Sequence, residues 1–452
     1  MFRQIFAKAI ALCLAASALW AQDHAPVPDH VVTEFGAPPA APEGPLTPSV
    51  AEALEAVLAI AVNQSEWDAE NTGSFETVSQ SNDPRLVWTL TDMQRFAWRP
   101  EFHTALTQVA GTLLSTPFEG SRQRAEIINK MIAWEIPAYP GYLANKRRVF
   151  TNYVPGWEQI FVDGDIAWQL VDWGGVSIDA RPYDMTDEVC HCIPAVDNPT
   201  VTSAAEATWL ADDDIVFGVV VNGEARAYPR QIMEVREMVN DSLGGRDLGI
   251  PYCTLCGSAQ AYFTDRMPPG VKRPILRTSG LLIRSNKVMY DVETNSVFDT
   301  FQGKAVTGPL AAIGLQLNQT TVVTSDWHTW RATYPDTTVL SEDLALGRDY
   351  NLRETRDANG PIFPVGDVDP RLPVHEDIVG TIGHDGTPIA FPRATAVAAL
   401  TSGKEVFFQG VKLELSAGGV QAIGPDGQHL ATHQAFWFAW SQFHPTTILW
   451  GE

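Results

Sequence analysis

Cysteine and positive charge are both scarce in this sequence. Five of the 452 residues are cysteine, and 31 Lys and Arg face 54 Asp and Glu, which gives a net charge of −23. An acidic surface of this kind repels phosphate backbones and anionic membranes. Composition therefore predicts that nucleic acid is not a partner.

Established catalytic signatures are also missing. The sequence has no glycine-rich phosphate loop, no HExxH metalloprotease motif and no GxSxG nucleophile motif. Beyond the N-terminus, no stretch of about 18 apolar residues occurs, so we expect no integral membrane span after signal removal. These absences leave open whether the protein is an enzyme.

The first residues have the pattern of an export signal. Arg3 and Lys8 precede an apolar run from Ala9 to Trp20, and Ala16-Ser17-Ala18 or Leu19-Trp20-Ala21 could be the cleavage site. We predict a signal peptide over residues 1–21 and a periplasmic or secreted mature protein. The alternative is an uncleaved N-terminal anchor.

The remaining chain predicts an α+β protein, with an N-terminal helical domain followed by a β-rich domain with an internal duplication. Hydrophobic residues make up 45% of the chain, enough for more than one core. The predicted segments are a flexible Pro/Ala-rich linker over 22–48, a helical domain over 49–175, a β-rich domain with a CxxC motif over 185–345, a linker over 346–376, and a second, shorter repeat over 377–452 packed on the first.

Local signals support this division. Ser49 and Glu52 are spaced as a capping box, and Val50, Leu54 and Val57 continue at helical spacing. Further helical stretches are expected at about 93–114 and 122–135. An apolar run over 215–221 followed by Asn222-Gly223 predicts a β-hairpin.

Two blocks of sequence recur in the same order, which predicts the duplication. Residues 222–230 align with 385–393, and residues 327–335 align with 437–445. The second copy lacks the CxxC motif. Chance similarity of turn motifs is the alternative explanation.

The cysteines fall into two short motifs. Cys190-His191-Cys192 and Cys253-Thr-Leu-Cys256 hold four of them, and Cys13 lies in the predicted signal peptide. One interpretation is a zinc or copper site, since thiolates and imidazole suit these soft cations.

Two other interpretations of the cysteines stay open. Cys253 and Cys256 are the pair expected to act in a dithiol–disulfide couple. The third interpretation is structural disulfides in an exported chain, for instance from Cys190 or Cys192 to Cys253 or Cys256.

A polar stretch downstream of the CxxC motif is a candidate ligand site. Ser285, Asn286, Tyr290 and Asp291 fall within seven residues and could bind a polar small molecule. The alternative is turn formation by Ser285-Asn286 and by Asp291 with the residues after it.

Several of these motifs together resemble a bacterial family known only as a domain of unknown function, DUF3179. The matching pieces are residues 193–199, 222–229, 252–259, 279–291 and 330–341. The resemblance covers about residues 190–345 and is expected to extend to the C-terminus. It implies no settled activity or cofactor. The CxxC motif lies inside the resemblance, whereas Cys190-His191-Cys192 lies at its edge.

The sequence therefore leads to two main functional hypotheses. The first is a metal-binding or thiol-redox role centred on Cys253 and Cys256, with a small-molecule or protein partner that the sequence does not identify. The second is a non-catalytic binding or scaffolding module whose cysteines form structural disulfides. A third is an enzyme acting on an exported polymer through Tyr290 and Asp291.

Overall fold

The computed structural model describes residues 27–63, 72–185, 190–341 and 360–451, and it divides into two compact units, residues 1–38 and 39–452. In the first unit, Asp29–Phe35 form helix α1, inside the segment predicted as a linker. The predicted signal peptide lies outside the described residues, as does part of the predicted linker over 346–376.

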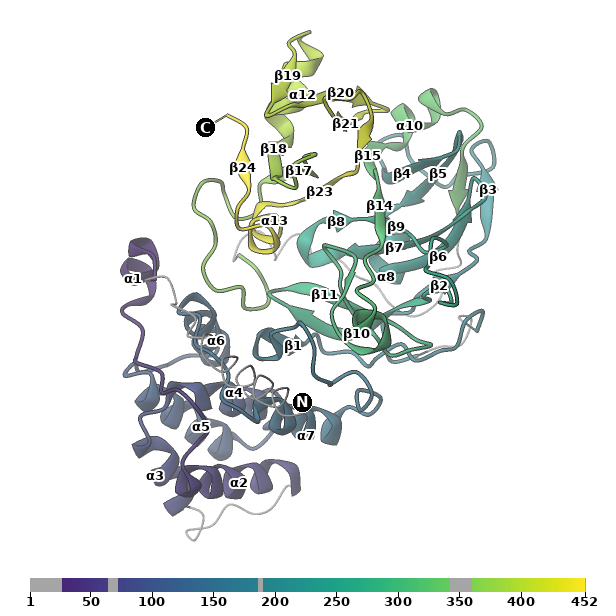
Figure 1. The fold of residues 1–452 in the computed structure, drawn as a ribbon. Helices are drawn as coiled ribbons and strands as arrows, with labels where there is room; N and C mark the ends of the chain where they lie inside the picture. The colour runs from purple at the N-terminus through teal and green to yellow at the C-terminus, as the bar shows by residue number, and fades with distance from the viewer. Residues whose placement is uncertain (1–26, 64–71, 186–189, 342–359, 452) are drawn as a thin grey trace, which may run out of the picture. The chain divides into compact units, whose positions relative to one another are not determined.

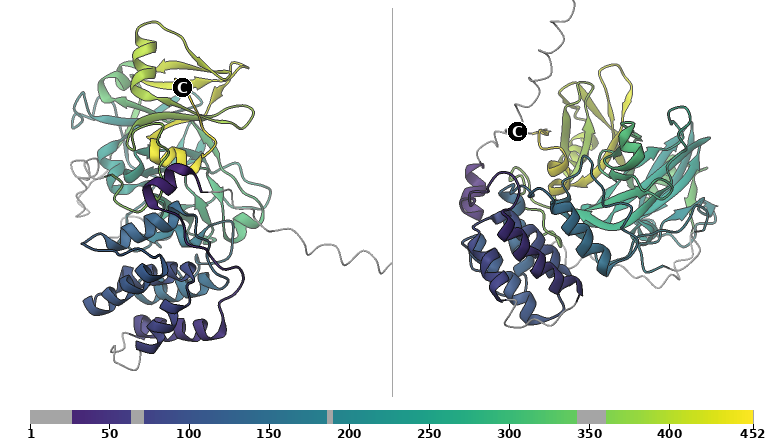
Figure 2. Two further views of the ribbon diagram at one scale, coloured as in Figure 1. Left: turned by 90° about the vertical axis from the view of Figure 1, so that its left-hand side faces the viewer. Right: turned by 60° about the horizontal axis from the view of Figure 1, so that its bottom comes forward.

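The second unit begins with a helical region, as the sequence predicts. Helices α2 to α7 lie together as a bundle in both views of Figure 2. Their bounds are α2 Pro48–Asn63, α3 Thr72–Gln80, α4 Val87–Phe96, α5 Pro100–Leu113, α6 Gln123–Ala133 and α7 Tyr142–Tyr153, with a 3₁₀ turn, η2, at Pro84–Leu86. The bundle is built from short helices because each apolar face finds a partner within a few turns.

Two details of the helical region differ from the sequence prediction. Helix α2 begins at Pro48, so Ser49 lies inside the first turn instead of capping it. The stretch predicted as one helix over 93–114 is two helices that separate before Pro100. Proline disfavours helical geometry at the preceding residue and suits the first turn of a new helix, which explains the break.

A β-rich region follows (Figure 1), and the described residues form five sheets. The first has the order β1 (Val171–Trp173), β10 (Leu276–Ile283), β11 (Asn286–Asp291), β12 (Val297–Asp299) and β13 (Lys304–Ala305). The second has the order β14 (Asn318–Thr320), β9 (Ala261–Phe263), β7 (Arg246–Cys253), β6 (Met238–Leu243) and β2 (Val196–Asp197), with β8 (Ser258–Ala259) also on β7.

Three further sheets complete the region. The third sheet has the order β15 (Val323–Asp326), β4 (Ile215–Val221), β5 (Glu224–Pro229), β16 (Thr338–Leu340) and β3 (Val201–Ser203). The fourth has the order β23 (Thr432–Phe436), β17 (Asp377–Ile382), β18 (Pro388–Pro392) and β24 (Ile448–Leu449). The fifth has the order β19 (Val406–Phe408), β20 (Val411–Ser416), β21 (Gly419–Ile423) and β22 (His429–Leu430). Short helices interrupt the strands: η3 Trp168–Leu170, α8 Arg230–Arg236, η4 Thr254–Cys256, α9 Gly308–Ala312, α10 Trp327–Thr333, α12 Arg393–Thr401 and α13 Trp437–Phe443.

The hairpin predicted around Asn222-Gly223 is present. Strands β4 and β5 pair in antiparallel register from Val216–Pro229 to Val221–Glu224. Asn222 and Gly223 both have positive φ, 49° and 86°. A two-residue turn of this kind matches the right-handed twist of the flanking strands.

Two sheets share one pattern of strands. The order β15-β4-β5-β16 and the order β23-β17-β18-β24 each contain two antiparallel pairs followed by one parallel pair. In each sheet a buried tryptophan lies over a glycine: Trp330 over Gly218, and Trp440 over Gly380. Each indole N–H donates to a threonine seven residues later.

The second of these sheets packs on the CxxC segment. Strand β23 lies against β8 (Figure 1). Cys253 and Cys256 belong to the same buried cluster as Trp437, Phe438 and Trp440. The two thiols therefore lie in the core between the sheet that contains β23 and the sheet that contains β7, and not at an exposed edge.

None of the described helices has both the length and the apolar character needed to cross a lipid bilayer.

Candidate functional site

The CxxC motif forms a tight turn between two strands. Cys253 ends β7, Thr254–Cys256 make the 3₁₀ turn η4, and Gly257 follows with a φ of 59°. A Cβ at Gly257 would lie 2.9 Å from the Phe436 ring, so both backbone conformation and packing require glycine there. The turn brings both sulfurs to the same neighbour.

That neighbour is the turn of the β10–β11 hairpin. The thiols of Cys253 and Cys256 point to the carbonyl oxygen of Ser285 at 3.8 and 3.6 Å. Cys256 Sγ also lies 3.5 Å from Oδ1 of Asn286, whose side-chain nitrogen is buried and makes no hydrogen bond among the described residues. Cys253 and Cys256 remain thiols and form no disulfide with each other.

A buried pair of opposite charges flanks Cys253. The Lys287 ammonium lies 3.4 Å from Oε2 of Glu237 and donates to the carbonyl oxygens of Glu237 and Tyr252. Glu237 also accepts from the Thr254 hydroxyl at 3.0 Å. Lys287 and Glu237 are only 4% and 6% exposed, so their charges act with little screening by solvent.

The pKa of Cys253 is lowered by these surroundings. Burial by itself acts to raise it, because desolvation disfavours a thiolate. The hydrogen bond from Cys256, the backbone N–H of Lys287 and the Lys287 charge together outweigh both burial and the opposing charge of Glu237. Cys253 therefore ionises more readily than a buried thiol without these neighbours.

Cys253 lines a pocket that spans about 490 Å³, part of which is open to solvent. Lys287 and Glu237 are its charged lining, and most of the remaining wall is apolar. Its wall includes the side chains of Cys253, Lys287, Glu237, Ile193, Leu282 and Phe363. A pocket that is largely apolar with a few convergent polar groups is typical of a small-molecule site.

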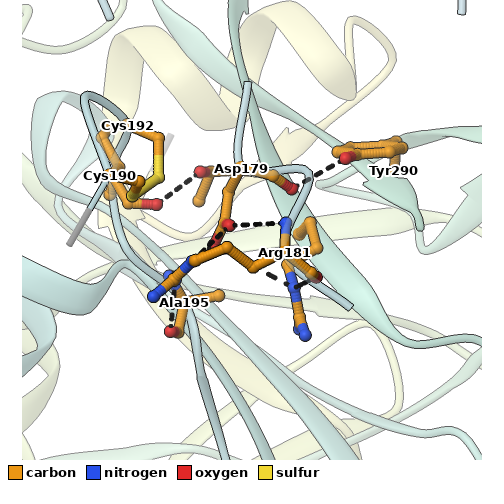
Figure 3. The surroundings of a disulfide bond; sticks show 9 residues. Asp179, Arg181, Cys190, Cys192, Ala195 and Tyr290 are labelled. Carbon is orange, nitrogen blue, oxygen red and sulfur yellow. Dashed lines mark hydrogen bonds and ion pairs between the residues drawn. A yellow bond between two sulfur atoms is a disulfide. The ribbon is translucent and has the colours of Figure 1, made fainter. Parts of the chain in front are cut away.

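The first cysteine motif forms its own disulfide. Cys190 and Cys192 are bonded to each other across a single intervening residue, with Cα atoms 5.1 Å apart (Figure 3). His191 between them is exposed, and its carbonyl accepts from the Ser177 N–H. Ile193, directly after this disulfide, lines the same pocket as Cys253.

Asp179 lies beside the disulfide and is the third member of a candidate metal group. One oxygen of Asp179 and the sulfurs of Cys190 and Cys192 lie within 4.8 Å of one another. The Asp179 carboxylate already accepts from the Arg181 guanidinium at 2.7 Å and from the Ala195 N–H at 2.9 Å (Figure 3). A metal ion there would need the disulfide reduced and would compete with Arg181 for these oxygens.

The sulfurs of the four cysteines do not surround one common point. Among the described residues, Cys253 and Cys256 do not join the group of ligand atoms around Cys190 and Cys192, and His191 is not part of that group either. The disulfide expected across the two motifs is instead closed within the first motif. The reason is topological: the first motif lies before β2, while Cys253 ends β7 and faces the β10–β11 turn.

The polar stretch after residue 284 is divided between different neighbours. Ser285 and Asn286 lie at the thiols, whereas the Tyr290 hydroxyl donates to the Asp179 carbonyl at 2.7 Å, beside the disulfide (Figure 3). Asp291 accepts from the Ile275 N–H and from Thr294, as the turn interpretation expects. Asp291 is thus occupied within its own hairpin.

Two residues of the site were not singled out by the sequence. Lys287 directly follows Ser285-Asn286, and a lysine within a short buried strand is the signal that could have found it. Glu237 gives no such signal, because its partner lies 50 positions away and only the fold brings the two together.

Comparison with known proteins supplies a family without an activity. Residues 190–413 match the model of the family described as "Protein of unknown function (DUF3179)". The match extends beyond the residue 345 that the sequence motifs indicate and stops short of the C-terminus. No curated protein and no solved structure matches the chain.

Proposed function

We propose that the protein carries out thiol–disulfide exchange at Cys253 and Cys256. The DUF3179 family, whose model matches residues 190–413, has no known function, so the proposal is based on the geometry of the site alone. The observation that carries the proposal is the lowered pKa of Cys253, which opens on a pocket while Cys256 lies behind it as hydrogen-bond donor. A reactive thiol backed by a second, buried thiol is the arrangement that this chemistry needs.

The reaction balances without a further co-reactant. The Cys253 thiolate attacks one sulfur of a substrate disulfide and releases the other half as a thiolate, forming a mixed disulfide. Cys256, once deprotonated, attacks the Cys253 sulfur and releases the second half. The protein pair loses two electrons and two protons, and the substrate disulfide becomes two thiols.

The buried charge pair supports the same roles. Lys287 stabilises the thiolate of Cys253, and Glu237 holds Lys287 in place. Cys256 Sγ has two acceptors within reach, the Ser285 carbonyl at 3.6 Å and Asn286 Oδ1 at 3.5 Å, and together they favour a protonated Cys256 until the exchange begins. Cys253 is therefore assigned as nucleophile and Cys256 as resolving thiol.

Binding of a zinc or copper ion by Cys253 and Cys256 is the second candidate. The specific observation in its favour is that both sulfurs face one point beside two oxygens, the Ser285 carbonyl and Asn286 Oδ1. Two thiolates suit Cu(I), whereas Zn(II) prefers four N or S ligands and would find only two here. A copper ion would be held by these two residues as a soft cation.

We also propose that the two similar sheets are copies of one ancestral unit, the second having lost the thiol site. The shared strand order and the paired Gly218–Trp330 and Gly380–Trp440 contacts support this duplication. The division into a helical domain over 49–175 and β-rich segments over 185–345 and 377–452 is part of the same proposal.

Export to the periplasm or beyond is proposed on the N-terminal sequence pattern. The Cys190–Cys192 disulfide supports it, since such bonds persist mainly in oxidising compartments. A disulfide in this setting and a reduced pair at Cys253 and Cys256 would give the two motifs different redox states in one protein.

The test uses the purified full chain. The Cys256→Ser variant is expected to accumulate a mixed disulfide at Cys253 when mixed with 2-hydroxyethyl disulfide, and Cys253→Ser is expected to accumulate none, as read by intact-protein mass spectrometry. Metal content by plasma mass spectrometry is measured on the same sample. Equal labelling of the two variants would overturn the assignment, and one copper per chain that blocks the reaction would favour the second candidate.

A further inference from the structure

A second pocket adjoins the thiol pocket. It spans about 350 Å³, part of which is open to solvent, and its wall shares Leu282 and Phe363 with the thiol pocket. Arg284 and Ser285 line the second pocket, whereas Cys253 and Lys287 line the first. The β10–β11 hairpin therefore contributes residues to both.

The turn of that hairpin has an unusual composition. Ile283 pairs with Asn286, so Arg284 and Ser285 form a two-residue loop. Both have positive φ, 45° and 65°, a geometry that asparagine and glycine adopt far more readily. Strain of this kind persists mainly at functional sites. Here it places the Ser285 carbonyl at the thiols and the Arg284 side chain in the neighbouring pocket.

Arg284 is a half-buried cation that lacks an ion-pair partner among the described residues. Its one hydrogen bond runs to Oε1 of Gln442 at 3.5 Å, the limit for such a bond. Burial lowers its pKa, and Glu135 and Asp367 oppose this only as more distant charges.

The other charges of the second pocket are matched within the protein. Arg124 forms a bidentate pair with Asp172, both distances being 2.8 Å. Asp92 is paired with Lys146 at 2.7 Å. Among the described residues that line this pocket, Arg284 is thus the cation without an ion-pair partner, and a partly buried guanidinium favours a carboxylate bound through two hydrogen bonds.

From this geometry we infer that the thiol site acts on small disulfides that carry a carboxylate, with Arg284 binding the carboxylate in the second pocket while Cys253 attacks one sulfur of the disulfide. This inference rests on the proposed thiol–disulfide exchange. The net charge of −23 opposes an anionic substrate at long range. At physiological salt that field fades within about 8 Å, so Arg284 dominates inside the pocket.

The inference is tested with three disulfides of different charge on the full chain. Oxidised glutathione carries carboxylates, 2-hydroxyethyl disulfide is neutral, and cystamine is cationic. The rate of mixed-disulfide formation at Cys253 is measured in a Cys256→Ser background, with and without Arg284→Gln. Arg284→Gln is expected to slow the reaction with oxidised glutathione about tenfold or more, because a charge-assisted bond is lost, and to leave the neutral disulfide unchanged.

Matched controls separate binding from folding. Arg148→Gln removes an exposed arginine of α7 that pairs with Glu55, and it is expected to change none of the three rates. Arg284→Lys keeps the positive charge and is expected to recover part of the loss. S-methylglutathione, which has carboxylates but no thiol, is expected to protect Cys253 of the unmodified chain from iodoacetamide.

The outcomes distinguish the two proposals. Equal slowing with all three disulfides, or no slowing at all, together with no protection by S-methylglutathione, would overturn the role of Arg284 and leave thiol exchange standing. If Cys253 reacts with none of the disulfides, thiol exchange itself falls, while protection by S-methylglutathione would still report on anion binding.

Discussion

At the scale of single residues, the ionisation of Cys253 depends on two buried charges of opposite sign. Lys287 lowers the pKa of this thiol, and Glu237 raises it. Both effects are transmitted over short distances through an interior of low dielectric constant. The same pair therefore allows the pKa to be moved in either direction by one substitution.

Lys287→Met is expected to raise the pKa of Cys253, since the stabilising charge is lost while burial and Glu237 remain. Alkylation of Cys253 by iodoacetamide at pH 7 should then slow severalfold, and its pH profile should shift to higher pH. Glu237→Gln is expected to shift the profile to lower pH, because Gln keeps the hydrogen bond to Thr254 without the negative charge.

The control for this pair is Lys304→Met, which removes a half-exposed lysine paired with Asp165. It should leave the pH profile of alkylation in place. Shifts of the same sign in Lys287→Met and Glu237→Gln would mean that the two variants act through loss of structure and not through charge.

The sequence indicates which cysteines lie together in one turn, but it does not indicate which cysteines are bonded to each other. The CxxC spacing alone indicates that Cys253 and Cys256 lie in one turn, and they do. That Cys190 pairs with Cys192 could not be read from spacing, since four cysteines allow three connectivities. A bond that closes a loop of three residues also constrains the unfolded chain little, so it is a weak structural staple.

At the scale of elements, two glycines determine how two helices sit on their sheets. The ring of Trp330 in α10 occupies the space above Gly218 of β4, and the ring of Trp440 in α13 occupies that above Gly380 of β17. An added Cβ would approach the rings to 2.0 and 2.2 Å. These contacts are too short to be tolerated without a shift of the helix or the strand.

Gly218→Ala and Gly380→Ala are each expected to lower the free energy of unfolding by about 1–3 kcal/mol, the usual effect of overpacking a core. Urea unfolding followed by tryptophan fluorescence measures the change. Gly73→Ala is the control, because this helical glycine in α3 has nothing within 4 Å of an added Cβ, and it should be neutral or slightly stabilising.

Similar losses at residues 218 and 380 would support the duplication, since they follow from equivalent packing. A loss at one position and none at the other would count against equivalent roles for the two sheets. The paired sequence blocks predicted such an equivalence, but no sequence pattern indicated that a glycine lies beneath each tryptophan.

At the scale of the whole molecule, a short strand joins the helical region to the site. Strand β1 pairs with β10, and Asp172 of β1 binds Arg124 of α6 through two hydrogen bonds of 2.8 Å. Burial acts to raise the pKa of Asp172, but the neighbouring Arg124 outweighs it and the pKa is lowered. The helical region thus holds the strand beside the hairpin that carries Arg284 and Ser285.

Asp172→Asn is expected to reduce the free energy of unfolding by roughly 1–3 kcal/mol, because it leaves the partly buried Arg124 guanidinium without its charged partner. Since the folded pKa of Asp172 is depressed, the ion pair stabilises fully above about pH 4 and its contribution disappears as pH falls through the folded value. The difference between variant and unmodified chain, measured by urea unfolding, should therefore shrink in acid.

Glu55→Gln supplies the matched control. It removes an ion pair with Arg148 in which both side chains are exposed, and its expected cost is below about 1 kcal/mol. A cost for Asp172→Asn as small as that of Glu55→Gln would mean that β1 is held by its strand pairing alone.

The sequence by itself determined the features that depend on neighbouring residues: the α+β class, the Asn222-Gly223 hairpin and the tight turn between Cys253 and Cys256. Each follows from local backbone preference or from the period of apolar residues. Only the tertiary structure decided which groups face the thiols, that the two cysteine motifs remain apart, and that Arg284 lies in an adjoining pocket. Ionisation and recognition depend on charges a few ångströms away in space, and here those charges come from residues far apart in the chain.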